Sequence, residues 1–367
     1  MRACLIIFSV LFLTCSAAVA QNLFLLSSLD YVNDAEQIAM GESYVANPFG
    51  LTSFRHNPAT LAGLSGARIY YSYRDNEIHE LFKNSYFRDF GLALATPAGN
   101  FGLHYSRFNY LESIITDENG VRVSESTLYD YTGYLTYGLQ IDQNFAAGIN
   151  LKIYGSDVDV KSGETIYSAD DAYVIDFGLT YSTPGILASS TVSDTLILGI
   201  ALQNFGSDHK SRFELGESET TIQLPRYLKL GLTYRLQAGY DRYGSLFEYL
   251  LTAQYGRWLN PKSDFDKGKA DLGGIGFKVR FYEIFSLQIG GYYQSYFNFY
   301  GNEDVLNMRY GFSVAVPFKR LNMTEPVSLI FSYSHVPINS TGGLFFSDFK
   351  YRTWLFTAQL EYNLNLW

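Results

Sequence analysis

Apolar and polar residues alternate through much of this chain, and the alternation is clearest near its end. From Thr353 to Trp367 one strand face carries Trp354, Phe356, Ala358, Leu360, Tyr362, Leu364 and Leu366, and the other carries Thr357, Gln359, Glu361, Asn363 and Asn365. A period of two is the pattern of a β-strand with one apolar and one wet face. A strand of this kind indicates a barrel that crosses an outer membrane.

Thirteen earlier segments show the same alternation, and most are about as long as the nine to eleven residues of a tilted membrane strand. The predicted strands are 67–74, 86–96, 101–110, 126–141, 145–155, 172–182, 195–205, 226–236, 245–256, 268–281, 284–294, 306–316, 327–336 and 353–366. The connections between successive predicted strands alternate in length. Counted in chain order, most even-numbered connections are brief and most odd-numbered ones are long and polar, with 183–194 as a long exception among the even ones. Outer-membrane barrels alternate short periplasmic turns with long outer loops. We therefore predict an all-β, transmembrane antiparallel β-barrel of about 14 strands over residues 67–367, with both termini in the periplasm.

The first twenty residues have the three parts of a signal peptide. Arg2 supplies the positive end, residues 5–13 the apolar centre, and Ala18-Val19-Ala20 a small-x-small cleavage site. The apolar stretch is shorter than the roughly 20 residues of a membrane-spanning helix. We therefore assign residues 1–20 to a signal peptide.

Composition narrows the class of protein further. Aromatic residues make up 17% of the chain, which suits the aromatic girdles of a membrane barrel, although a secreted β-sandwich remains the competing fold. The net charge of −9 on an exported chain argues against nucleic acid as a partner. Both cysteines, Cys4 and Cys15, lie in the predicted signal peptide, so no disulfide or cysteine metal site is expected in the mature chain.

Residues 21–66 differ from the barrel and contain two helix-start signals. Asn33-Asp34 can cap a short helix that runs toward Met40-Gly41, and Asn57-Pro58-Ala59 places a capping Asn before a Pro at the first helical position. The segment is apolar but interrupted by Gly and Pro. We predict that it plugs the barrel lumen, with a loosely ordered periplasmic tail as the alternative.

The same segment resembles the opening of a known protein family. The stretch Ala35-Glu-Gln-Ile-Ala-Met40-Gly41-Glu-Ser43-Tyr-Val45-Ala46, followed by Asn57-Pro58-Ala59-Thr-Leu61-Ala62-Gly63, resembles PorV/PorQ-like outer-membrane proteins and, more distantly, FadL-type transporters. Two positions depart from the family pattern. Glu42 stands where a small residue is usual, and Trp367 is one residue out of phase with the apolar strand face.

The resemblance implies two different functions, of which the first is our leading prediction and the second is its alternative. PorV/PorQ-like proteins work in type IX protein secretion and surface attachment, which implies secretion-apparatus proteins or cargo as partners. FadL-type proteins are passive channels for long-chain fatty acids and other hydrophobic molecules, which implies a hydrophobic ligand in the lumen. In both cases the residues implied in plug packing and gating are Met40, Gly41, Asn57, Pro58 and Ala59.

Candidate catalytic and metal-binding residues are sparse. His104 and Ser106 share a strand face and could act as base and nucleophile, but a hydrogen bond in the lumen is the simpler role for this pair. The five histidines lack metal-ligand spacing. Acidic residues in the predicted loop 156–171 could hold Ca²⁺, although solvated charge is the simpler interpretation; they are Asp157, Asp159, Glu164, Asp170 and Asp171. We expect no enzyme activity, cofactor or metal.

Overall fold

The computed structural model describes most of the chain. The described residues are 29, 32, 34–50, 52–75, 85–116, 122–162, 167–185, 187, 189, 191–213, 218–241, 244–260, 271–298, 301–321, 327–340 and 349–362. The predicted signal peptide and the last residues of the C-terminal strand therefore lie outside the described residues.

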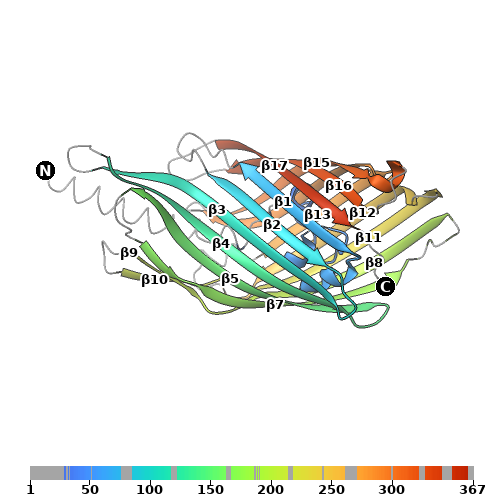
Figure 1. Ribbon diagram of the computed structural model, residues 1–367, viewed down its shortest axis with the longest axis horizontal. Helices are drawn as coiled ribbons and strands as arrows, with labels where there is room; N and C mark the ends of the chain where they lie inside the picture. Colours follow the sequence, from blue (N-terminus) through green and yellow to red (C-terminus); the bar gives the residue numbers. More distant parts are fainter. Residues whose placement is uncertain are drawn as a thin grey trace.

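Fourteen antiparallel strands form a closed barrel (Figure 1). The strands are β1 (Ala67–Asp75), β2 (Tyr86–Leu94), β3 (Asn100–Thr116), β4 (Arg122–Gln140), β5 (Phe145–Ser162), β7 (Ala172–Pro184), β8 (Val192–Gly206), β11 (Tyr227–Asp241), β12 (Gly244–Trp258), β13 (Asp271–Phe281), β14 (Phe285–Asn298), β15 (Gly301–Pro317), β16 (Val327–Ser340) and β17 (Phe349–Tyr362). Each strand pairs with its neighbour in chain order, and β1 pairs with β17 to close the sheet, with Ala67 opposite Tyr362. The predicted fold class and strand count are thus confirmed.

The two faces of the wall differ as the alternation predicts. Phe90, Leu103 and Leu287 point outward and are 50–52% exposed, whereas Asp89 and Ser106 point inward and are buried. An outward apolar face and a polar inner face are typical of a membrane barrel. Within the described residues no helix is both long and apolar enough to cross a bilayer, a criterion that does not apply to strands.

The two ends of the barrel have different connections. Brief turns join β2 to β3, β4 to β5, β11 to β12 and β13 to β14 at the short-turn end, where β1 begins and β17 finishes. A 3₁₀ turn, η4 (Phe318–Leu321), follows β15 at this end. The predicted long join 183–194 is shorter than expected, because β7 continues to Pro184 and β8 starts at Val192.

The opposite, long-loop end carries a sheet that the sequence did not predict. β5 runs through residues expected to be loop, and β6 (Tyr167–Asp170), β9 (His209–Phe213) and β10 (Ser218–Ile222) form a three-stranded sheet in the order β10-β9-β6. The expectation that 156–171 and 206–225 are plain polar loops was therefore wrong. β9 pairs with β10 of the same loop and with β6 of the other loop. These pairings depend on contacts that the pattern of the separate segments does not indicate.

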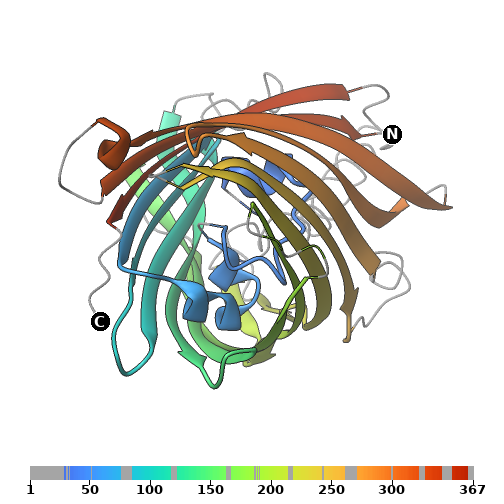
Figure 2. The same cartoon turned by 90° about the vertical axis from the view of Figure 1, so that its right-hand side faces the viewer.

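Residues 34–50 and 52–66 lie inside the barrel, and we call them the plug segment (Figure 2). It contains the helix α3 (Ala35–Ala39) and two 3₁₀ turns, η1 (Ser53–Arg55) and η2 (Pro58–Gly63). The side chain of Asp34 accepts hydrogen bonds from the backbone N–H groups of Glu36 and Gln37 in α3, and the Asn57 side chain accepts one from Ala59 N in η2. Both local starts follow ordinary capping chemistry.

Glycines in the wall allow the plug backbone to approach the strands closely. A Cβ atom at Gly148 would lie 2.3 Å from the Pro58 carbonyl carbon, and one at Gly290 would lie 2.3 Å from Gly41 N. Contacts this short are not tolerated between a real Cβ and backbone. The plug therefore rests on strand positions that have no side chain.

We expect Gly148→Ala to displace the plug and to destabilise the protein by about 1–3 kcal/mol, the usual effect of overpacking. Thermal unfolding, followed by circular dichroism and by heat-modifiable migration on gels, measures the change. Gly133→Ala is the matched control, because a Cβ at Gly133 meets nothing within 4 Å. Equal melting of the two variants would contradict the close seating of the plug.

Candidate functional site

The Met40-Gly41 turn is seated against β13 and β14. Gly41 has φ +64°, and a Cβ there would lie 2.4 Å from the Gly291 carbonyl oxygen. On the wall side, Gly274 and Gly276 face the carbonyl oxygens of Gly41 and Met40. Only glycine fits this turn, because both its backbone angle and its surroundings exclude a side chain.

Glu42, the departure from the family pattern, is held by a charge. Its φ of +57° is unusual for a residue with a Cβ. Its carboxylate pairs with the Arg309 guanidinium of β15, which also lies over the Tyr292 ring. The ion pair across the plug and wall accounts for an acidic side chain at a position where a small residue is usual.

Asn57-Pro58-Ala59 is attached to the wall mainly through the Asn57 side chain. Its amide nitrogen donates to the Leu179 carbonyl of β7 at 3.1 Å and to the Val45 carbonyl of the plug at 2.7 Å. Pro58 and Ala59 lie against Gly148 of β5. Asn57 thus caps η2 and also ties two plug turns to one strand.

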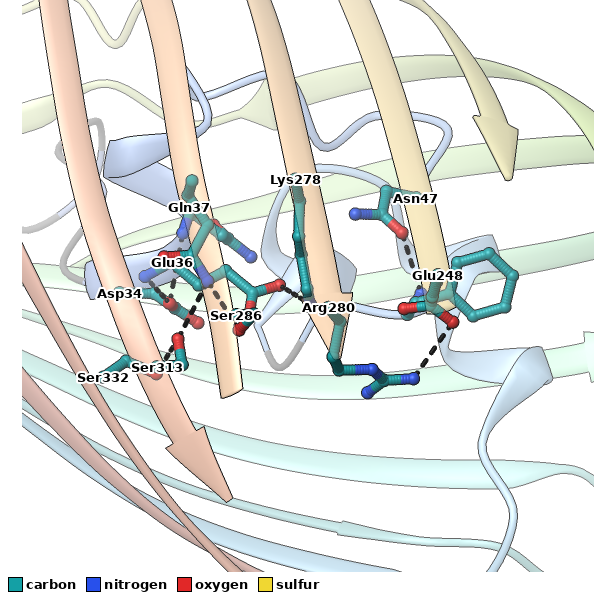
Figure 3. Close-up of polar contacts among 12 residues, drawn as sticks. Asp34, Glu36, Gln37, Asn47, Glu248, Lys278, Arg280, Ser286, Ser313 and Ser332 are labelled. Carbon is teal, nitrogen blue, oxygen red and sulfur yellow. Dashed lines mark hydrogen bonds and ion pairs between the residues drawn. The ribbon is translucent and has the colours of Figure 1, made fainter. Parts of the chain in front are cut away.

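Ion pairs among the described residues connect the plug segment to the wall at three places. Arg55 pairs with Asp89 of β2 at 2.9 Å and Glu36 with Lys278 of β13 at 2.8 Å, in addition to the pair between Glu42 and Arg309. Figure 3 shows Glu36 reaching from α3 to Lys278, beside the neighbouring pair of Arg280 and Glu248 within the wall. The pairs lie on opposite sides of the lumen and therefore fix the plug at both.

Asp34 is a buried carboxylate with only neutral hydrogen-bond donors. It accepts from the backbone N–H groups of Glu36 and Gln37 and from the Thr52 hydroxyl, at 2.9–3.2 Å. Burial, together with the nearby Glu36 charge, raises the pKa of Asp34 to about 7. Burial and the charge of Lys229 lower the pKa of His56, whose Nε2 contacts the Gln37 side-chain oxygen.

His104 and Ser106 both point into the lumen, but each has another partner. His104 Nδ1 contacts the Tyr70 hydroxyl, and Ser106 donates to Asp89 at 2.5 Å. Asp89 also lies 3.9 Å from His104 Nε2. Sequence reasoning missed Asp89, although its inward strand phase, shared with Gly91, could have indicated it. The serine donates to a carboxylate and the histidine contacts a tyrosine, which is a packing network rather than the arrangement of a base and its nucleophile.

A second feature that sequence reasoning missed is an apolar hollow of about 760 Å³ in the outer wall. It surrounds Gly133 of β4, where the absence of a side chain leaves open space. Outward side chains of the neighbouring strands line it: Phe90, Leu103, Tyr105, Leu151, Ile153 and Tyr173. We call it the wall hollow. The sequence contained one indication of this hollow, the glycine at position 133, which lies at an outward-facing position of a predicted membrane strand.

The wall is irregular beside this hollow. Ile175 and Phe205 also line the hollow, and the register of β7 against β8 shifts between Ile175 and Phe177. At the shift Asp176 points inward, pairs with Lys152 at 2.7 Å, and accepts a hydrogen bond from the Asn204 N–H. A bulge and a buried ion pair therefore lie directly at the edge of the hollow.

The predicted Ca²⁺ ligands are only partly brought together. Asp157, Asp170 and Asp171 line a second hollow of about 570 Å³, whereas Asp159 pairs with Arg107 and Glu164 lies outside the described residues. Within the part of the chain that the structure describes, no group of three acidic or histidine side chains has metal-binding geometry.

Comparison with solved structures finds barrels of similar layout. The chain is similar to the toluene transporter TodX of Pseudomonas putida, with 10% identity, 89% of this chain and 96% of that chain covered, and a TM-score of 0.48. It is also similar to a FadL homologue of Pseudomonas aeruginosa, with 9% identity, coverage of 90% and 98%, and a TM-score of 0.43. These similarities concern the fold alone. No protein-family model and no curated protein sequence matches the chain.

The raised pKa of Asp34 predicts a pH dependence. Its carboxyl binds a proton more tightly in the folded state, so its contribution is fully present below about pH 4 and is lost as the pH rises through about 7. Asp34→Asn keeps the capping oxygen and removes the titration. We expect the difference in melting temperature between variant and parent to grow from pH 5 to pH 8 in favour of the variant. A difference that does not change with pH would contradict this account.

The pair of Arg55 and Asp89 predicts strong coupling. Asp89→Ala leaves the Arg55 charge buried, and we expect a loss of about 3–5 kcal/mol in the free energy of unfolding. The double variant Arg55→Met and Asp89→Leu removes both charges and should recover most of that loss. Chemical denaturation of the parent, both single variants and the double variant measures the coupling. If the two single variants change the free energy of unfolding additively, Arg55 and Asp89 are not energetically coupled, and this prediction is wrong.

Proposed function

We propose that this protein is a non-enzymatic channel of the bacterial outer membrane for hydrophobic small molecules. The wall hollow carries the proposal. Its volume is that of a small-molecule site, its lining is apolar, and it opens on the lipid-facing surface. A hydrophobic molecule can reach it from the membrane without crossing water.

The position of the hollow supports passage between wall and lumen. The bulge between β7 and β8 interrupts the ladder of hydrogen bonds at its edge. Such irregularities often mark functional sites in barrels. Behind the bulge, Lys152 and Asp176 form an ion pair on the lumen side of the wall. Passage requires both this pair and the local strand pairing to rearrange.

A role in type IX secretion, the first hypothesis from sequence, receives less support. The residues that carry the resemblance to PorV/PorQ-like proteins, 35–46 and 57–63, are the residues that seat the plug against glycines of the wall. Plug packing accounts for them under either function. We therefore propose the channel, the alternative from sequence, ahead of the secretion role, with the short-turn end and both termini in the periplasm.

Gly133→Phe tests the proposal, because a Cβ at Gly133 meets nothing within 4 Å and the added ring extends into the wall hollow. We expect uptake of radiolabelled 1-dodecanol by expressing cells to fall to the level of cells without the protein. Leu287→Phe, on the lipid face of β14, is the matched control and should transport normally.

Heat-modifiable migration on gels verifies that both variants fold. Native mass spectrometry of the parent should also show a co-purified hydrophobic molecule that Gly133→Phe lacks. Unchanged uptake by folded Gly133→Phe would overturn the channel proposal, and a stoichiometric protein partner with no bound small molecule would favour secretion.

A further inference from the structure

The wall hollow has a polar neighbour on the same strands. The second hollow is lined by Tyr131, Asp157, Tyr167, Asp170 and Asp171, and it shares Tyr173 with the wall hollow. We call it the upper hollow, because it lies toward the long-loop end.

The strand register shows that the two hollows adjoin. Gly133, Ile153 and Tyr173 form one row across β4, β5 and β7. Two residues farther along each strand, Tyr131 and Gly155 pair in the next row on the same face. Successive rows on one face are about 7 Å apart. An apolar groove therefore passes directly into a polar one.

The upper hollow carries negative charge beside aromatic rings. Tyr131 donates to Asp171 at 2.6 Å, and Tyr129 donates to Asp157 at 3.3 Å. These partners are neutral and leave both carboxylate charges in place. Arg107, the nearby cation of β3, is already paired with Asp159, and Lys210 stands opposite Asp170 in the side sheet.

We propose that the two hollows form one site for an amphipathic cation, an alkyl chain with an amine or quaternary ammonium head. The inference rests on the proposed function for the wall hollow and adds the class of ligand. The alkyl chain lies in the wall hollow around Gly133. The cationic head lies in the upper hollow, where carboxylates attract it and the aromatic side chains of Tyr131 and Tyr173 form part of the lining.

The test compares three probes with the same chain length: dodecyltrimethylammonium, dodecanoate and 1-dodecanol. Equilibrium dialysis against the full protein in lipid nanodiscs, with empty nanodiscs as the blank, gives the affinity of each. We expect the cation to bind most tightly and dodecanoate most weakly. Equal affinities, or tighter binding of dodecanoate, would overturn the proposal.

Variants of the upper hollow test the contribution of the cationic head to binding separately from that of the alkyl chain. The double variant Asp157→Asn and Asp171→Asn keeps both tyrosine hydrogen bonds and should weaken the cation about fivefold, with 1-dodecanol unchanged. Asp271→Asn is the matched control, because Asp271 accepts a similar hydrogen bond from Tyr255 on the far wall. An undiminished affinity of the double variant for the cation would overturn the proposal.

The same experiments distinguish a failure of the amphipathic-cation site from a failure of the proposed channel. If all three probes bind alike and Gly133→Phe abolishes binding, the hollow is a site for hydrophobic chains and the head is not recognised. If the cation is preferred but Gly133→Phe transports 1-dodecanol normally, the site binds ligand without being the channel.

Discussion

Closure of the barrel by the pairing of β1 with β17 is the constraint on which the other features depend. In hydrocarbon, an open strand edge would leave backbone N–H and C=O groups without partners, at several kcal/mol each. Closure gives every strand two neighbours and two fixed faces. A barrel of fourteen strands is wider than the eight-strand barrels that wall side chains can fill. The strand number therefore leaves a lumen that the plug segment occupies (Figure 2).

The polar inner face decides how the plug is held. Hydrogen bonds and ion pairs dominate, and apolar clusters such as Met40, Tyr44 and Leu250 are small. A displaced plug would leave Arg55 and Asp89 buried without each other. The pair therefore discriminates between plug positions more than it adds stability. Wall glycines contribute to this selection, because the observed position brings plug backbone over strand positions without side chains.

The strands were predictable because one face of each strand contacts lipid and the other faces the lumen, so apolar and polar residues alternate along it. The alternation stops being informative beyond the membrane, so the ends of β3, β4 and β5 and the whole of β6, β9 and β10 were missed. The caps at Asp34 and Asn57 were predictable because they use neighbours in sequence. The contact of Asn57 with Leu179 was not, because topology alone brings them together. In the sequence, Asp89 beside Arg88 resembles a pair of surface charges. Only the alternation along the strand indicates that Asp89 points inward.

A glycine has opposite consequences on the two faces of this wall. Inside, the space beside Gly148 is occupied by Pro58 and Ala59. Outside, the space beside Gly133 is open and forms the wall hollow. Such a hollow does not by itself select a ligand, because any alkyl chain fits it. Selection requires a polar group within reach of the chain's end, and the row that carries Tyr131, with Asp171 bonded to it, supplies one about 7 Å along the strands.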